Sequence, residues 1–219
     1  MMTPRNYAQE ASPTENKTQS EKDAKHQRIA SGIIDDPQYA EFGIYEQTAA
    51  RPESATPIIT RLPLELPKGA RIALIGNTLL DRSLHFGHIE SLIYQRYPEH
   101  QLVIRNLSWS GDTVNLRPRP DNFADIFQHL YHEKTDVIIA AFGFNESFAG
   151  PEGLDVFRKN LTDFIEQLQS KAFNGKTAAK VILISPIANE DLPNIPAASL
   201  NNERSEELTS ELQSHSDLV

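Results

Sequence analysis

The residues Asp136-Val137-Ile138-Ile139-Ala140-Ala141-Phe142 decide the fold class of this 219-residue chain. The run is short and apolar at every position after its first, which is typical of a strand buried on both faces of a parallel sheet. Three further runs have the same character and lie at residues 71–75, 101–107 and 180–186. Four buried strands that follow one another in this way predict a single sheet.

Segments with helical spacing of apolar residues separate these strands. They lie at residues 79–96, 121–131 and 153–170, with a thinner one at 201–213. In the second segment Asp121 is the expected N-cap, because a short side-chain oxygen at this position satisfies free backbone N–H groups. Strands that alternate with helices predict an α/β fold, a parallel sheet with helices on both sides.

The composition excludes several classes of function. The chain carries 21 Lys and Arg against 30 Asp and Glu, a net charge of −9, which disfavours a nucleic-acid partner. It has no cysteine, so disulfides, thiolate metal sites and a cysteine nucleophile are excluded. No apolar run reaches the ~18 residues of a membrane span, and no signal-peptide stretch begins the chain. We therefore expect no membrane span, and the localisation stays open.

The chain divides by composition into two parts. Residues 1–63 are mostly polar and show no periodicity, at least over their first half, and such a segment cannot bury enough surface to offset its ordering entropy. We expect this part to be largely disordered or to wrap over a surface. Residues 64–219 carry the alternating pattern and are expected to form the α/β domain.

Three consecutive strands end in short polar turns that contain glycine. The first is Gly76-Asn77-Thr78, the second contains Gly111, and the third runs from Gly143 to Glu146. Since the carboxyl ends of parallel strands meet at one edge of a sheet, these turns are expected to lie together. They would combine a hydroxyl, a glycine N–H and a carboxamide, which suits acyl transfer.

The order of these turns resembles the SGNH hydrolases, the GDSL lipase and esterase superfamily, over about residues 70 to 190. That resemblance implies a three-layer flavodoxin-like fold and cleavage of O-acyl esters, and we expect neither a cofactor nor a metal. It places Thr78 at the nucleophile position, Gly111 as the oxyanion-hole N–H and Asn145 as the oxyanion-hole side chain. The residues implied to support them are Gly76, Asn77, Gly143 and Glu146, with Glu146 where the family usually has Asp.

Thr78 is the first departure from the family pattern, which has serine at this position. The extra methyl restricts χ1 and crowds the path of attack. Two interpretations stay open: Thr78 is a weakened nucleophile, or it is a structural turn residue or helix N-cap.

The second departure is the absence of the late Asp-x-x-His block, so the general base is unknown. The chain has seven histidines, of which His85 and His88 are nearest to the first turn. His129 and His132 are spaced i, i+3 and are interpreted as surface or packing residues rather than as metal ligands.

The missing block suggests a hypothesis about length. The flavodoxin-like strand order has five strands, and this sequence supplies four before it stops. We therefore expect a C-terminally truncated member that lacks the last strand and helix. The residues around the turns resemble those of a narrower, variant branch with Gly-Asn-Thr in the first turn. Domains of this branch are found within larger bacterial proteins that are often exported and carry haem-binding modules.

The expected function is therefore that of an ester hydrolase domain, weak or inactive in this chain, acting on a small-molecule or glycan ester. The alternative is a non-catalytic module that binds a ligand or glycan in the same crevice. A nucleotide-binding domain is disfavoured, because the glycine-rich phosphate loops are absent. The oligomeric state stays open.

Overall fold

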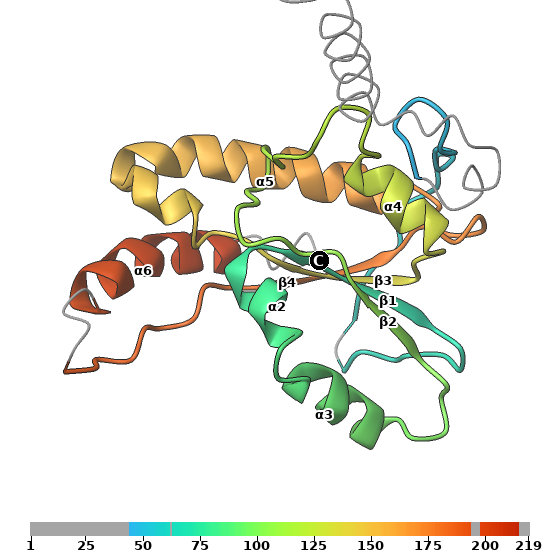
Figure 1. Ribbon diagram of the computed structural model, residues 1–219, viewed down its shortest axis with the longest axis horizontal. Helices are drawn as coiled ribbons and strands as arrows, with labels where there is room; N and C mark the ends of the chain where they lie inside the picture. Colours follow the sequence, from blue (N-terminus) through green and yellow to red (C-terminus); the bar gives the residue numbers. More distant parts are fainter. Residues whose placement is uncertain (1–43, 62, 194–197, 215–219) are drawn as a thin grey trace, which may run out of the picture. The chain divides into compact units, whose positions relative to one another are not determined.

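The computed structural model describes residues 44–61, 63–193 and 198–214 (Figure 1). Its sheet consists of the strands β1 (Arg71–Gly76), β2 (Val103–Asn106), β3 (Val137–Ala141) and β4 (Lys180–Ile184). All neighbouring strands pair in parallel, in the order β2-β1-β3-β4. This order matches the first four positions of the flavodoxin-like arrangement, and the predicted α/β fold class is confirmed.

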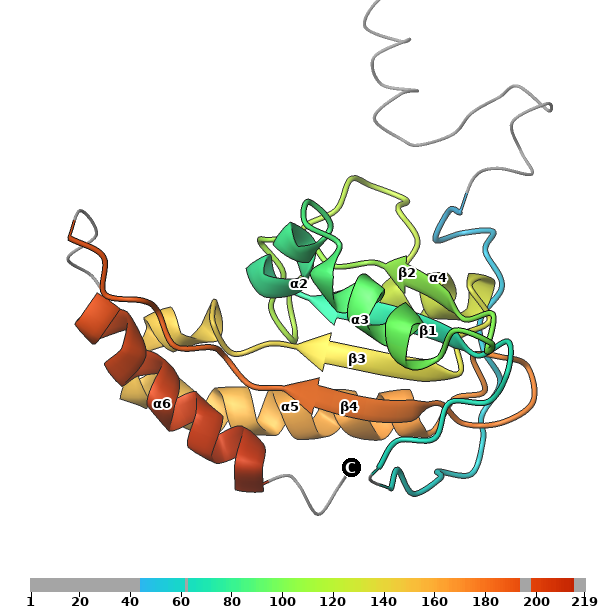
Figure 2. The same cartoon turned by 90° about the horizontal axis from the view of Figure 1, so that it is seen from below.

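Helices cover both faces of this sheet. They are α2 (Thr78–Ser83), α3 (His88–Arg96), α4 (Ile126–His132), α5 (Leu154–Gln169) and α6 (Ala198–Ser214), with two 3₁₀ turns, η2 (Glu146–Ala149) and η3 (Pro151–Gly153). Figures 1 and 2 show α2 and α3 on one face and α4 and α5 on the other. The molecule therefore has the three layers that a buried parallel sheet requires.

Each face of the sheet has its own apolar core, and β3 contributes to both. Ile138 and Ala140 pack with α4 and α5, whereas Val137 and Ala141 pack with α2 on the opposite face. Because successive side chains of a strand point to opposite faces, both sets must be apolar. This explains why the run that predicted the fold shows no polar alternation.

The segment at 79–96 forms two helices, so the prediction of one continuous helix is wrong. The α2 helix ends at Ser83 and α3 begins at His88. Between them Gly87 adopts φ 64°, a left-handed conformation that interrupts a right-handed helix. The apolar spacing alone did not reveal this break, because both short helices pack against the same core.

The N-cap predicted at Asp121 is also wrong. The helix α4 begins at Ile126 and is capped by Asp125, whose carboxylate accepts the Gln128 backbone N–H at 2.9 Å. The Gln128 side chain in turn accepts the Asp125 backbone N–H at 3.0 Å, which completes a capping box. Asn122 has φ 58°, so the chain just after Asp121 is not helical.

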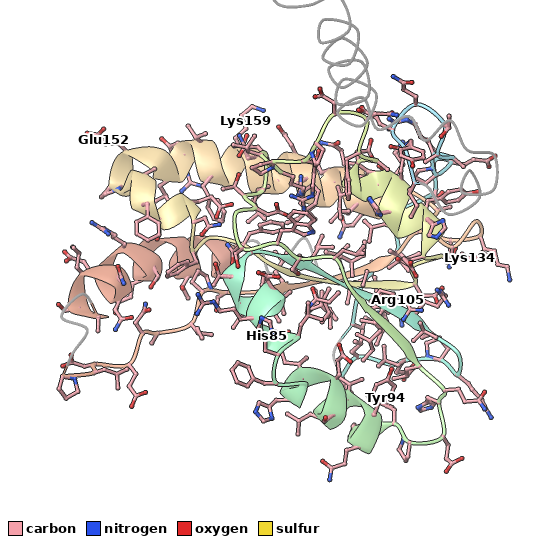
Figure 3. The ribbon with its side chains drawn as sticks, in the orientation of Figure 1. His85, Tyr94, Arg105, Lys134, Glu152 and Lys159 are labelled. Carbon is pink, nitrogen blue, oxygen red and sulfur yellow. The ribbon has the colours of Figure 1, made fainter. Side chains whose placement is uncertain are left out.

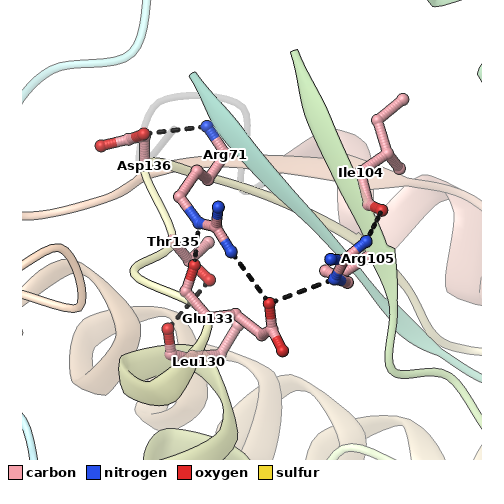
Figure 4. A network of polar contacts seen from close by, with 7 residues as sticks. All are labelled: Arg71, Ile104, Arg105, Leu130, Glu133, Thr135 and Asp136. Carbon is pink, nitrogen blue, oxygen red and sulfur yellow. Dashed lines mark hydrogen bonds and ion pairs between the residues drawn. The ribbon is translucent and has the colours of Figure 1, made fainter. Parts of the chain in front are cut away.

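A polar network fixes the amino edge of the sheet (Figure 4). The Glu133 carboxylate pairs with the guanidinium groups of Arg71 on β1 and Arg105 on β2, at 3.1 and 3.3 Å. The Arg71 backbone N–H also donates to the Asp136 carboxylate at 2.9 Å. These contacts lie at the end of the sheet opposite the glycine-containing turns and serve the fold.

Contacts within the chain define two units. One contains the described residues 44–48 together with 119–124, where Tyr45 and Phe123 form an antiparallel bridge. The other contains residues 49–118 and the described residues from 125 onward. Within this larger unit Ala49 accepts a hydrogen bond from Gln128 and Thr60 one from the β4 backbone at Val181. Residues 1–43, where most of the predicted polar segment falls, lie outside the described residues.

Among the described residues, no helix has both the length and the apolar character needed to cross a bilayer.

Candidate active site

The three glycine-containing turns meet at the carbonyl oxygen of Ser110. The Thr78 hydroxyl donates to this oxygen at 3.3 Å, and the Asn145 side-chain amide donates to it at 2.8 Å. Thr78 follows β1, Ser110 lies in the turn after β2, and Asn145 follows β3. The carboxyl edge of the sheet therefore brings the predicted residues together, as the parallel topology requires.

Glycine is required in the first turn. Gly76 has φ 144°, and a Cβ at this position would lie 2.2 Å from the carbonyl oxygen of Ala141 on the neighbouring strand. This close approach lets the next residue, Asn77, donate its backbone N–H to that same oxygen at 3.1 Å. The turn is thereby fixed against β3 before α2 begins.

Asn77, not Thr78, occupies the N-cap position of α2. Thr78 is the first residue of the helix, so the interpretation of Thr78 as an N-cap is wrong. Its hydroxyl donates to a carbonyl oxygen, and a carbonyl oxygen does not act as a general base. Thr78 therefore has no activating partner within the described residues.

The second turn presents a free backbone donor. Trp109 donates its backbone N–H to Gly76 at 3.1 Å and so joins the first two turns. Gly111 is exposed, and nothing lies within 4 Å of the position that its Cβ would take. Its N–H has no hydrogen bond within the described part of the chain. Such a donor is open to an incoming oxygen.

Asn145 holds the second turn in place through two hydrogen bonds. Its side-chain nitrogen donates to the carbonyl oxygens of Ser110 and Asp112, each at 2.8 Å. An amide nitrogen has two hydrogens, so both are used here. Donation to an oxyanion would require one of these bonds to exchange for the substrate oxygen.

Glu146 joins the third turn to the loop after the second. One carboxylate oxygen accepts the Val114 N–H at 2.8 Å, and the other accepts the Gly143 N–H at 2.9 Å. Burial raises the pKa of Glu146 above 4.5, while these backbone hydrogen bonds and the Arg117 charge oppose the shift. The side chain therefore has a positioning role that the sequence did not specify.

One contact in the site was missed by sequence reasoning. The Ser110 hydroxyl donates to the Asp81 carboxylate, which lies one helical turn beyond Thr78 on α2. This hydrogen bond gives Ser110, rather than Thr78, a carboxylate as its partner. The two residues are 29 positions apart, and no motif links them in the sequence.

No histidine activates Thr78 within the described residues. His85 is exposed in the segment after α2 (Figure 3), and His88 begins α3. His26 and His215 lie outside the described residues. Among the residues described, no group of three or more His, Cys, Asp or Glu side chains could hold a metal ion.

A crevice of about 410 Å³ opens beside Thr78. Its walls are formed by α2, the start of α3, the ends of β3 and β4, and the segment after β4. The lining residues are predominantly apolar and comprise Asn77, Thr78, Leu79, Arg82, Ser83, Phe86, His88, Ile89, Ala141, Phe142, Phe144, Ile184, Ser185, Pro186, Ile187 and Asn189. A cavity of this size at the carboxyl edge of an α/β sheet is suited to a small organic ligand.

No protein-family model matches the chain, and no curated protein matches its sequence at a significant level. Several solved structures are similar to it, and two of them are as follows. BT4096, described as a gut microbial diltiazem-metabolizing enzyme, is 18% identical, with 69% of this chain and 35% of that chain covered and a TM-score of 0.48. An inferred SGNH hydrolase from Slackia heliotrinireducens is 15% identical, with 68% and 76% covered and a TM-score of 0.46.

The described chain thus spans about a third of the length of BT4096. Similarity at this level identifies neither a substrate nor a catalytic residue in this chain.

Proposed function

We propose that the chain is an ester hydrolase domain of the SGNH type that cleaves an O-acyl ester of a small molecule or glycan. One observation carries the proposal: three turns converge on the Ser110 carbonyl oxygen, and Thr78, one of the groups that donate to it, also lines a crevice of about 410 Å³. This convergence sets a hydroxyl, an unpartnered glycine N–H and a carboxamide at one edge of the sheet. The Gly-Asn-Thr of the first turn supports placing the domain in a variant branch of that superfamily.

The proposed reaction begins with attack of the Thr78 hydroxyl oxygen on the ester carbonyl carbon. The carbonyl oxygen becomes an oxyanion, which accepts the Gly111 N–H and, once its bond to Asp112 exchanges, an amide hydrogen of Asn145. The C–O bond to the alcohol then breaks, and the alcohol leaves with the hydroxyl proton carried by water. Water hydrolyses the acyl-threonine and restores the Thr78 hydroxyl.

This reaction is expected to be slow. A positioned general base contributes about 10²- to 10⁴-fold to such steps, and the Thr78 hydroxyl instead donates to a carbonyl oxygen. The β-branched side chain further restricts the rotamers from which the hydroxyl can attack. We expect turnover well below that of an enzyme with a complete triad.

A hydrolysis assay with p-nitrophenyl esters tests the proposal. We compare the wild-type chain with Thr78→Ala, and use Ser110→Ala as a matched control that removes the neighbouring hydroxyl. The expected result is slow turnover that Thr78→Ala abolishes and Ser110→Ala retains.

Labelling with a fluorophosphonate, followed by peptide mapping, identifies the nucleophile directly. The adduct is expected on Thr78. An adduct on Ser110 would move the nucleophile to the second turn, with Asp81 as its base. If neither residue is labelled and no ester is cleaved, the chain is the non-catalytic binding module.

A further inference from the structure

The crevice beside Thr78 carries charge of one sign. Two of its lining residues are basic, Arg82 and His88, and no Asp or Glu is among the described residues that line it. The chain as a whole has 30 acidic residues against 21 Lys and Arg. A local site without carboxylates on such an acidic chain favours an anionic ligand.

The Arg82 guanidinium is available to bind that ligand. Arg82 is exposed, and within the described part of the chain it has no side-chain hydrogen bond or ion pair. It lies on the same side of α2 as Leu79 and Ser83, as the spacings i, i+3 and i+4 require, and all three line the crevice. A guanidinium beside an apolar wall is suited to bidentate binding of a carboxylate.

The remaining wall favours a ring. Phe86 and Phe144 line the crevice, together with the apolar side chains of Ile89 and Ile184. The ring of Phe142, although this residue also borders the crevice, is buried against Phe164 in the core on the other face of the sheet. Aromatic side chains bind a further ring through offset or edge-to-face packing, which adds to the burial of apolar surface. Phe86 is 70% exposed, so this apolar surface reaches the mouth of the crevice.

We propose that the crevice binds a small aromatic monocarboxylate, with its ring beside Phe86 and Phe144 and its carboxylate on Arg82. The proposal goes beyond ester hydrolysis, because binding of a free acid needs no nucleophile. The proposal also fixes the orientation of the ligand. Its carboxylate is held one helical turn beyond Thr78, on the side of the crevice that α2 forms.

Calorimetric titration of the full chain with 3-phenylpropionate tests the proposal. The neutral 3-phenylpropan-1-ol and the cationic 3-phenylpropylammonium have the same ring and chain, so they isolate the contribution of charge. At about pH 8 the acid is present as its carboxylate and the amine as its ammonium. We expect the acid to bind most tightly, the alcohol more weakly and the ammonium weakest.

Two variants separate the roles of charge and ring. Arg82→Gln is expected to weaken binding of the acid about fivefold and to leave the alcohol unchanged, as for an ion pair near the surface. Phe86→Ala is expected to weaken both ligands alike. Arg96→Gln, an exposed arginine at the end of α3, is the matched control and should change neither.

Equal binding of acid and alcohol, no effect of Arg82→Gln, or no binding of any of the three compounds would overturn the proposal. These outcomes are distinct from those of the hydrolysis assay. Binding of the acid without any ester cleavage supports the proposed carboxylate site and refutes the hydrolase. Ester cleavage without binding of the acid supports the hydrolase and refutes the proposed carboxylate site.

Discussion

Asn145 donates its side-chain amide to the carbonyl oxygen of Ser110 at 2.8 Å, across 35 positions of sequence. The same nitrogen donates to the Asp112 carbonyl oxygen at 2.8 Å. A residue predicted as an oxyanion donor therefore also holds the turn that presents the other donor, Gly111. Its two roles are coupled, because the hydrogens that fix the turn are those that an oxyanion would need.

Replacement of Asn145 by alanine should therefore affect stability even without a substrate. The buried Asp112 loses the Asn145 donor to its carbonyl oxygen, and the exposed Ser110 carbonyl oxygen loses one of its two donors, so we expect the free energy of unfolding to fall by about 1–3 kcal/mol. Urea denaturation of Asn145→Ala and of the control Asn160→Ala, on α5, measures this difference. If Asn145→Ala unfolds at the same urea concentration as the wild type, the amide does not fix the turn.

Gly76→Ala should be the most damaging small substitution at this edge of the sheet. The added Cβ would lie 2.2 Å from the Ala141 carbonyl oxygen, and φ 144° is unfavourable for any L side chain. We expect a loss of at least about 3 kcal/mol, because β1 and β3 must separate to admit the methyl group.

The control for this substitution is Gly175→Ala. Gly175 also has a positive φ, 73°, but nothing lies within 4 Å of its Cβ position. Gly175→Ala should lower the free energy of unfolding only by the cost of a side chain in the left-handed region, about 1 kcal/mol. Similar melting temperatures for the two variants would show that the close approach at Gly76 has no energetic consequence.

The start of α4 gives a direct comparison between prediction and structure. Asp125→Ala removes the carboxylate of the capping box and its ion pair with Arg51, so we expect a loss of about 1–2 kcal/mol. Asp121→Ala, at the position that the sequence favoured, should change stability by less than about 0.5 kcal/mol. Thermal unfolding of the two variants decides between them, and a larger effect at Asp121 would contradict the structure.

The sheet and the meeting of its turns were predictable for a simple reason. A strand that is buried on both faces, such as residues 137–141, is apolar at nearly every position, so its composition identifies it. The carboxyl ends of parallel strands necessarily lie at one edge of the sheet. Neither inference requires knowledge of side-chain contacts. The positions of Thr78, Gly111 and Asn145 at one edge follow from the topology alone.

The chemistry of the site was less predictable. The sequence shows that Asn145 has an amide but not that both its hydrogens are donated to one turn. The contact of Asp81 with Ser110 joins α2 to the second turn through side chains, and its partners have no fixed spacing in the sequence. The break at Gly87 was also hidden, because a left-handed residue does not alter the apolar spacing on either side.

Glu146 gives a prediction for the pH dependence of stability. Burial raises its pKa in the folded chain above the 4.5 of the free side chain, so between these two values the folded state binds more protons than the unfolded state. The contribution of Glu146 to stability is therefore fully present below pH 4.5 and is lost as the pH rises through the folded-state pKa. Glu146→Gln cannot titrate and should lack this loss.

Urea denaturation of the wild type and Glu146→Gln at a series of pH values isolates this effect, since other carboxylates contribute equally to both. The amide oxygen of glutamine can replace only one carboxylate oxygen, so either Val114 or Gly143 loses its acceptor at every pH. The lost hydrogen bond lowers the stability of Glu146→Gln by the same amount at every pH. In addition to this constant difference, the wild type should lose stability relative to the variant as the pH rises above 4.5. Glu152→Gln, on the exposed η3 turn, controls for the change in net charge (Figure 3). A wild-type advantage that grows with pH would mean that the two backbone hydrogen bonds outweigh burial at Glu146.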